Sequence, residues 1–515
     1  MHVFETILVL LTGATVLSSF ARRMNIPYPT LLALGGALIA FIPGAPRLEL
    51  PPELILALFV APVLLDAAYD ASLRDLRHSW VPVLSLVLAA VALTTVAVAI
   101  TVRQFLPDIP WAAAVALGAL LAPPDAVAAL AVMRQVDPPH HIRVVLEGES
   151  LLNDASALLI YRLAVGAVAA GSFSVTGAIP TFALVVFGSV VVGWLAARPV
   201  ALITERMEDA PSSVILQFVM TFGVWLAAER LGLSGVVTIV VFGLTLARRS
   251  VSQLPAYLRV PSFAIWETVT VVLNVLAFTL IGLQLRPILE TLSGAELLRS
   301  VGIALALLAV VMVVRIAWVM THHAASVLTT RLLGGDAAGT PTSAPSTKAA
   351  FVIGWSGMRG IVTLAAALAL PDGFPYRDFM QLTAFVVVLG TLVIQGLTLG
   401  PLLKFLRLPK DDTVQTELGL AREVALKAAM GELQDSTPAA ERLRLEYAEA
   451  LGKARQGGDP RDSADNVLRR RLVAASRNAI EDLRSRGTIG DDAFRRVEEE
   501  LDWLELSAGR ANASN

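Results

Sequence analysis

The sequence predicts an all-α protein that crosses a membrane many times and ends in a small helical domain. Three observations carry this prediction: repeated long apolar runs, little charge between them, and an abrupt change in composition after Leu408. Of the 515 residues, 55% are hydrophobic and 16% are charged, whereas a soluble domain is about 25% charged. Apolar runs of about 20 residues are long enough to cross a bilayer.

About thirteen membrane helices are expected, an odd number that places the two termini on opposite sides. Their boundaries come from charged residues and from Pro/Gly breaks. They are expected at residues 3–20, 28–44, 52–71, 80–104, 110–133, 143–170, 175–201, 211–230, 233–248, 262–288, 299–324, 347–370 and 378–406. The positive charges after the first run identify it as a retained helix and not a secretory signal, whose charges come first.

The loops between these helices alternate in positive charge. One set carries Arg22, Arg23, Arg74, Arg77, Arg134, Arg143, Arg198, Arg206, Arg248, Arg249, Arg259, Arg331, Lys348, Lys404, Arg407 and Lys410. The other set carries Arg47, Arg103, Arg230, Arg286, Arg299 and Arg377. Roughly sixteen charges against six predict a cytoplasmic C-terminus and an outside N-terminus, because positive loops stay in the cytoplasm.

Two domains are predicted: a transmembrane domain at 1–408 and a cytoplasmic helical domain at 409–515. The second has about four amphipathic stretches with apolar residues at i, i+3, i+4 and i+7. Its charged faces are either simply solvated, or serve to bind a regulator or to dimerise. Residues 331–348 are rich in Gly, Ser, Thr and Pro and are expected to form a flexible loop. The chain has no cysteine, which excludes disulfides and thiolate metal sites, and no basic patch that favours nucleic acid.

The first group of buried polar residues lies in "LLAPPDAVAAL". Pro123 and Pro124 each remove a backbone donor and should unwind about one turn of the helix. Unwound backbone at membrane depth is tolerated where it lines a cavity or is buried in protein. The freed carbonyls and Asp125 are hard oxygen ligands that suit a small monovalent cation. The alternative is a kinked helix with Asp125 near the surface.

The second group lies in "EGESLLNDASALLIYRL", where the i,i+4 rule places Glu149 over Asn153 and Ser150 over Asp154. Charged side chains inside a membrane are rare and usually functional. Asp154 supplies a titratable pair of oxygens, and Asn153 supplies a carbonyl and an amide donor. The alternative is that Glu147 and Glu149 lie in solvent at the start of the helix. Asn153 and Asp154 would then only hold neighbouring helices together.

A second broken helix is predicted in "GWSGMRGIVTLAAALAL", where Gly354, Gly357 and Gly360 surround Arg359. Arg315 is likewise isolated in an apolar run. A buried arginine needs an acid partner; the alternative for Arg315 is that it reaches the membrane surface. Two interrupted helices at corresponding positions of two halves are typical of secondary transporters built from inverted repeats.

These motifs together resemble the sodium/proton exchanger family of the cation:proton antiporter superfamily, in its electroneutral, Asn-Asp branch. The resemblance rests on "LLDAAYD", "APPDAVA", "EGESLLNDASALLIYRLA", "LSGVVTIVVFGLTL", "LNVLAFTLIGLQL" and "GWSGMRGIVTLAAALALP", in family order. It implies inverted repeats with a dimerisation part and a mobile core part, and a homodimer in the cell (inner) membrane.

The resemblance also implies roles for single residues. Asp154, Asp125 and Asn153 correspond to ion-site residues, with Ser150 nearby and the two aspartates as ligands of the monovalent cation. Pro124 stands where many relatives have Thr, so a backbone carbonyl is expected there in place of a hydroxyl.

Three further residues are implied to be structural. Glu149 and Arg315 match a core ion pair, and Arg359 matches the arginine of the second broken helix.

The predicted activity is exchange of protons for monovalent cations, Na⁺ first and Li⁺ or K⁺ as alternatives, by alternating access. Because Asn153 replaces a second acid beside Asp154, one-for-one electroneutral exchange is expected, with a role in pH homeostasis and without a cofactor or enzymatic activity. The alternatives are a potassium/proton antiporter, a cation channel gated by the tail, and an intramembrane aspartyl protease. The channel lacks a filter-like repeat, and the double proline fits cation coordination better than a protease dyad.

Overall fold

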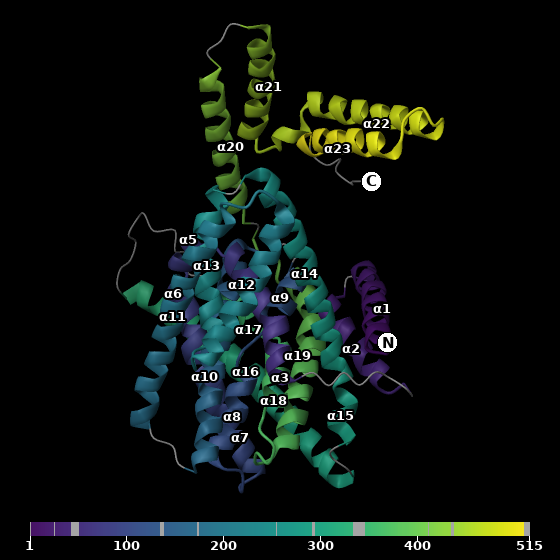
Figure 1. Cartoon of the computed structure of the whole chain (residues 1–515). Coiled ribbons are helices and arrows are strands. Elements are labelled where there is room, and N and C mark those ends of the chain that lie inside the picture. The colour runs from purple at the N-terminus through teal and green to yellow at the C-terminus, as the bar shows by residue number, and fades with distance from the viewer. Residues whose placement is uncertain are drawn as a thin grey trace. The chain divides into compact units, whose positions relative to one another are not determined.

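The computed structural model describes residues 2–24, 26–42, 51–133, 138–171, 175–253, 255–290, 294–332, 346–409, 411–433 and 437–508. It divides into two compact units, Met1–Pro409 and Lys410–Asn515, which are described separately. Every regular element of the described residues is a helix (Figure 1). The all-α fold predicted from the sequence is therefore confirmed.

The first unit is a helical bundle, and each predicted membrane segment is helical in it. Its helices are α1 (His2–Met24), α2 (Tyr28–Ala40), α3 (Pro52–Ile55), η1 (Leu56–Val60), α4 (Ala61–Asp70), α5 (Leu73–His78), α6 (Trp80–Leu84), η2 (Ser85–Ala90), α7 (Val91–Phe105), α8 (Trp111–Leu121), α9 (Ala126–Met133), α10 (His140–Ala170), α11 (Val175–Thr204), α12 (Ala210–Arg230), α13 (Gly235–Gln253), α14 (Ala256–Leu283), α15 (Leu285–Glu290), α16 (Gly294–Leu332), α17 (Thr347–Trp355), α18 (Ile361–Leu368) and α19 (Arg377–Leu406). The elements η1 and η2 are π-helical turns that continue directly into α4 and α7.

Seven of the described helical stretches are long and apolar enough to cross a membrane. They are Trp80–Phe105, His140–Ala170, Pro180–Thr204, Ala210–Arg230, Ala256–Glu290, Gly294–Thr329 and Arg377–Leu406. Other predicted spans are shorter apolar helices, such as α2 and α13, or are interrupted, such as α8–α9. The chain is a multi-pass membrane protein.

Several helix ends differ from the prediction. α2 ends at Ala40, four residues early, and α14 begins at Ala256, six residues early. α16 extends over 39 residues, from Gly294 to Leu332, where 299–324 was expected. Apolar residues indicate where a helix lies in hydrocarbon, but a helix continues past the bilayer until the backbone is interrupted. Most of the predicted 331–348 loop, 333–345, lies outside the described residues.

The interior of the first unit positions the interrupted helices. Eight of the eleven residues of α8, from Ala113 to Leu121, are buried, so the end of α8 lies inside the bundle. α2 and α14 cross closely because Gly36 and Gly282 face one another's backbones, with no space for a β-carbon at either position. Helices in membranes often pack through such small residues.

The second unit contains the four amphipathic helices that the sequence predicts. They are α20 (Thr413–Glu432), α21 (Pro438–Arg455), α22 (Ala464–Ser485) and α23 (Asp491–Ser507), with a short 3₁₀ turn, η3 (Pro460–Asp462). α20 packs against α21, and α22 packs against α23, so the unit consists of two helical hairpins (Figure 1). Its buried apolar side chains are few, among them Val473, Phe494 and Leu501.

Candidate functional site

The first interrupted helix is formed by α8 and α9. α8 ends at Leu121 and α9 begins at Ala126. The segment between them is not helical, because Pro123 and Pro124 cannot donate the backbone hydrogen bonds that a helix requires. Both prolines are buried. The break therefore exposes main-chain carbonyls to the interior of the protein, as the sequence predicted.

The second interrupted helix crosses the first at this point. α17 ends at Trp355 and α18 begins at Ile361. The backbone N–H of Asp125 donates to the carbonyl of Met358 at 2.6 Å. The Asp125 carboxylate lies so close to Gly360 that a β-carbon at residue 360 would overlap its Oδ2 atom. The two breaks are thus packed directly against one another.

Asp125 is half-buried at this crossing, and its two oxygens have different surroundings. Oδ1 accepts a hydrogen bond from the backbone N–H of Val127 at 2.8 Å. This contact caps the first turn of α9, as aspartate commonly does at helix starts. Oδ2 faces Gly360 at the start of α18.

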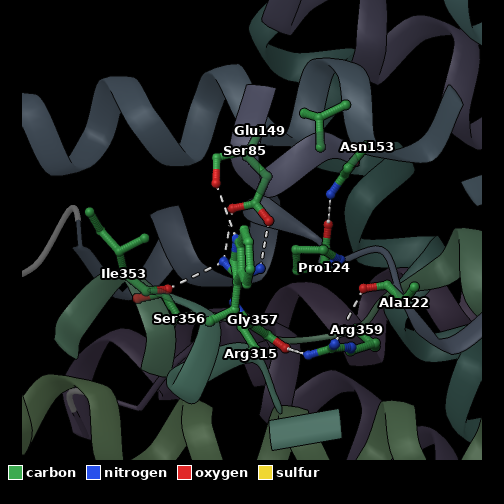
Figure 2. Close-up of polar contacts among 12 residues, drawn as sticks. Ser85, Ala122, Pro124, Glu149, Asn153, Arg315, Ile353, Ser356, Gly357 and Arg359 are labelled. Carbon is green, nitrogen blue, oxygen red and sulfur yellow. Dashed lines mark hydrogen bonds and ion pairs between the residues drawn. The ribbon is translucent and has the colours of Figure 1, made fainter. Parts of the chain in front are cut away.

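α10 is an unbroken helix of 31 residues that carries the other predicted site residues. Asn153 is completely buried on it. Its Nδ2 donates to the carbonyl of Pro124 at 2.9 Å (Figure 2), which fastens α10 to the first break. Its Oδ1 is also buried and has no hydrogen-bond donor among the described residues.

Asp154 follows on the same helix and is 9% exposed. It makes no hydrogen bond or ion pair with any residue that the structure describes, yet it is close enough to Asp125 for the two carboxylates to interact electrostatically. A buried carboxylate without a donor is unfavourable as a bare anion, so a proton or a cation is its natural partner. Ser150 lies half-buried one turn earlier, and its hydroxyl bonds to neither aspartate within the described structure.

Glu149 and Arg315 form a buried, two-pronged ion pair (Figure 2). Arg315 Nη1 donates to Oε1 at 2.5 Å and Nη2 donates to Oε2 at 2.8 Å. Nη2 also donates to the carbonyl of Ile353 at 3.2 Å. The side chains are 3% and 2% exposed, so the pair joins α10 to α16 in the protein interior and not at the membrane surface.

The sequence predicted an acidic partner for Arg359, but the structure shows main-chain carbonyls as its partners. The side chain is completely buried and forms no ion pair with any described carboxylate. Nε donates to the carbonyl of Leu121 at 3.1 Å. Nη2 donates to that of Ala122 at 3.3 Å (Figure 2). Nη1 donates to the Gly357 carbonyl. Arg359 thus neutralises the negative, C-terminal end of α8.

Two hydroxyl residues that the sequence analysis missed also hold this region together. Thr391 Oγ1 accepts a hydrogen bond from the backbone N–H of Arg359 at 3.0 Å. Ser156 Oγ donates at 2.8 Å to the carbonyl of Val87 and lies 2.9 Å from that of Asn153. Buried Ser and Thr commonly bond to carbonyls within membrane bundles, so the sequence carries no signal that distinguishes these two residues.

Two interrupted helices that cross beside a half-buried carboxylate, with a second, buried one nearby, are typical of one class of membrane protein. Discontinuous helices supply half-helix ends and free carbonyls at the midplane binding sites of secondary transporters. The fold and the site together therefore indicate a secondary transporter of ions.

Comparison with known proteins identifies the family. The family model described as "Sodium/hydrogen exchanger, transmembrane" matches residues 7–405, and the chain belongs to this family of Na⁺/H⁺ antiporters. A Na⁺/H⁺ exchanger of Mycobacterium tuberculosis is 30% identical over 97% of this chain and 95% of its own length. A sodium, potassium, lithium and rubidium/H⁺ antiporter of Bacillus pumilus is 30% identical over 84% of this chain and 66% of its own. A low-affinity Na⁺/H⁺ antiporter of Synechocystis is 29% identical over 86% of this chain and 82% of its own length.

A solved structure shares the fold. The sodium proton antiporter of Methanocaldococcus jannaschii, at pH 8, superimposes with a TM-score of 0.59 at 17% sequence identity. The similarity covers 79% of this chain and 100% of the archaeal one.

Proposed function

We propose that this chain exchanges one proton for one Na⁺ ion by alternating access, and that Asp154 carries either ion in turn. The observation that carries this proposal is the buried carboxylate of Asp154, which has no partner in the described structure and is close enough to Asp125 for the two carboxylates to interact electrostatically. A group in this setting is stabilised by whichever cation reaches it, and a proton and Na⁺ compete for the same oxygens.

Oxygen atoms around Asp154 complete the cation site in this proposal. Asp125 contributes Oδ2, since its Oδ1 is engaged in capping α9. Asn153 contributes Oδ1, the buried oxygen without a described donor. The Pro124 carbonyl holds the Asn153 amide in position, so Pro124 acts through its backbone, where a hydroxyl is not available. Carboxylate, amide and carbonyl oxygens are hard ligands that suit alkali cations.

The charges of the site support an exchange of one ion for one. Asn153 is neutral, Glu149 is neutralised by Arg315, and Asp125 lies at the positive N-terminal ends of α9 and α18. Asp154 is then the group whose charge must be compensated afresh in each half-cycle. One proton leaves when one Na⁺ binds, so a complete cycle moves no net charge.

The setting of the transporter follows from the loops and the family. The excess of positive charge in alternate loops supports a cytoplasmic C-terminus and an outside N-terminus. With the protein in the cell membrane as a homodimer, an exchanger of this kind contributes to pH homeostasis.

Transport by purified protein in liposomes tests the proposal. A pH-sensitive dye inside the vesicles reports proton movement when Na⁺ is added outside. The Asp154→Asn variant should lose Na⁺-dependent proton movement, because an amide cannot release a proton to a competing cation. Asp108→Asn is the matched control, since Asp108 lies exposed in the turn between α7 and α8 and should leave the rate unchanged. Exchange that persists in folded Asp154→Asn protein would exclude Asp154 as the carrier.

Two further arms of this experiment examine the ion and the stoichiometry. Li⁺ and K⁺ replace Na⁺ in turn, because the Bacillus pumilus relative is named for several alkali cations. Activity with K⁺ and none with Na⁺ would identify a potassium/proton antiporter. A membrane potential imposed across the vesicles should leave the exchange rate unchanged. A cation flux that follows the potential without proton counterflow would indicate a channel and contradict the proposal.

A further inference from the structure

α22 in the C-terminal unit carries two apolar stripes, of which only one is used inside its hairpin. The first packs against α23 and includes Val473, which is 5% exposed. The second faces away from α23. On it, Leu468, Leu472 and Leu483 are 51%, 58% and 40% exposed.

The second stripe continues without interruption along the helix. Its residues are Leu468, Leu472, Ala475, Ala479 and Leu483, with spacings of four, three, four and four. Ala475 and Ala479 are also exposed. Residues at these spacings share one face of an α-helix, and the same spacing forms the contact seam in pairs of helices. Large apolar side chains exposed in a continuous row usually mark an interaction surface.

We propose that this stripe pairs two copies of the chain through antiparallel α22 helices related by a two-fold axis. Along the stripe, two leucines are followed by two alanines and then by a final leucine. A two-fold axis between Ala475 and Ser476 places Leu468 opposite Leu483 of the second copy. It also places Leu472 opposite the small Ala479, so a large side chain meets a small one on each side of the axis.

The charges at the ends of the stripe are complementary under the same operation. Asp465 and Arg486 lie on the stripe's face, one at each end, and both are exposed. Arg486 also bonds to Asp482, one turn earlier on its own helix. The axis that pairs the leucines brings Asp465 of one copy beside Arg486 of the other, at both ends of the contact. A parallel arrangement would instead place like charges together, which is unfavourable. The pattern therefore favours a second copy of this chain over an unrelated partner, and antiparallel over parallel pairing.

The tethering of the tail to a membrane unit favours this contact. Two chains confined to the same membrane meet at a high effective concentration, so a surface of modest size can be occupied. The surface is isologous, as in most two-fold dimers, because the same stripe contributes both sides. The contact involves none of the ion-site residues, so it is independent of the proposed exchange mechanism.

Disulfide trapping in the full-length protein tests the contact. The chain contains no cysteine, so one introduced thiol reports a single position. Ser476 lies next to the proposed axis, where the two copies of a residue come within the Cα–Cα range of about 4.4–6.8 Å that a disulfide needs. Ser476→Cys should form covalent dimers under mild oxidation in membranes. Asn478→Cys, exposed two residues along on the opposite face of α22, is the matched control and should remain monomeric.

Charge reversal separates this pairing from an accidental encounter. In the Ser476→Cys background, Asp465→Arg should abolish the covalent dimer, and adding Arg486→Asp should restore it. Leu472→Glu should abolish it as well, while circular dichroism confirms that the tail remains helical.

Three outcomes overturn the proposal. One is equal cross-linking of Ser476→Cys and Asn478→Cys, and another is loss of the covalent dimer without recovery in the charge swap. The third is a Ser476→Cys protein that stays monomeric while its thiol resists labelling, which would place the stripe against the same chain.

Discussion

The Glu149–Arg315 pair provides a prediction whose magnitude follows from its geometry. Glu149→Gln removes the charge that both guanidinium nitrogens contact at 2.5 and 2.8 Å. Arg315 then keeps as acceptors the Ile353 carbonyl and the neutral amide oxygen of the new glutamine, and its Nε has no acceptor among the described residues. Removal of one partner from a buried pair lowers stability by about 3–5 kcal/mol, because it leaves an uncompensated buried charge.

This loss should appear as a lower melting temperature of the purified protein. An unfolding entropy of about 2.1 cal/mol/K per residue, applied to the unit Met1–Pro409, converts the loss to a decrease of roughly 3–6 °C. Thermal unfolding in detergent, followed by tryptophan fluorescence, measures this decrease for Glu149→Gln and Arg315→Gln separately.

An exposed pair of similar geometry is the control. Arg162 Nη2 contacts both Glu229 oxygens at 2.8 and 2.7 Å, but the side chains are 46% and 31% exposed. Arg162→Gln should therefore cost less than about 1 kcal/mol.

The double variant Glu149→Leu/Arg315→Met tests the reasoning further. It replaces both charges with apolar groups and should melt higher than either single variant. Additive losses in the double variant, or single losses no larger than that of Arg162→Gln, would refute the argument from buried charge.

Three other predictions follow from the structure. Gly360→Ala should abolish Na⁺-dependent proton movement in the liposome assay, because the new methyl group would displace the Asp125 carboxylate. Gly302→Ala is the control in the same assay, since a β-carbon at residue 302 would meet no other atom within 4 Å. Gly282→Ala should lower the melting temperature by forcing α2 and α14 apart, at a cost of about 1–3 kcal/mol, whereas Gly302→Ala should change it little. In the tail, a hydrogen bond from Arg461, with Arg422 nearby, holds the pKa of Asp459 below its usual value. Asp459 thus stabilises the tail above pH ~4 and loses this effect as the pH falls through its folded pKa, so Asp459→Asn should weaken the tail by about 1 kcal/mol at pH 7. In denaturant titrations of the full-length chain, the difference between Asp459→Asn and the parent should shrink below pH ~4, and a difference that grows there would contradict this assignment.

The sequence was sufficient to predict the membrane segments and the two breaks because both depend on local chemistry. A bilayer requires long apolar runs, and adjacent prolines interrupt a helix wherever they occur. The ends of α16 were harder to predict, since the polar turn after Trp318 remains helical. Apolar residues indicate the surrounding hydrocarbon, whereas the helix itself continues because no Pro or Gly stands between Trp318 and Gly334.

The partners of the buried groups could not be predicted by the same means. Arg359 was expected to contact an acid, but it contacts carbonyls of Leu121 and Ala122, which are 238 and 237 residues away in the chain. A free carbonyl at a helix end has the same partial charge in any sequence, so no residue type indicates its position. The Asn153–Pro124 contact is similar, because its acceptor is a backbone atom.

The positions of the helix ends explain why the charge of one side chain at the site, Asp154, is not balanced by the protein. Arg359 neutralises the carbonyl ends at α8 and Gly357, and the Asp125 carboxylate lies at the N-terminal ends of α9 and α18. Half-helix ends carry partial charges of opposite sign, so each break is balanced by one side chain. Asp154 lies on an unbroken helix, close enough to Asp125 to interact with it electrostatically, and has neither a helix end nor an arginine as partner among the described residues. A single mobile cation is sufficient to compensate it, and under the proposed mechanism this restricts each half-cycle to one ion.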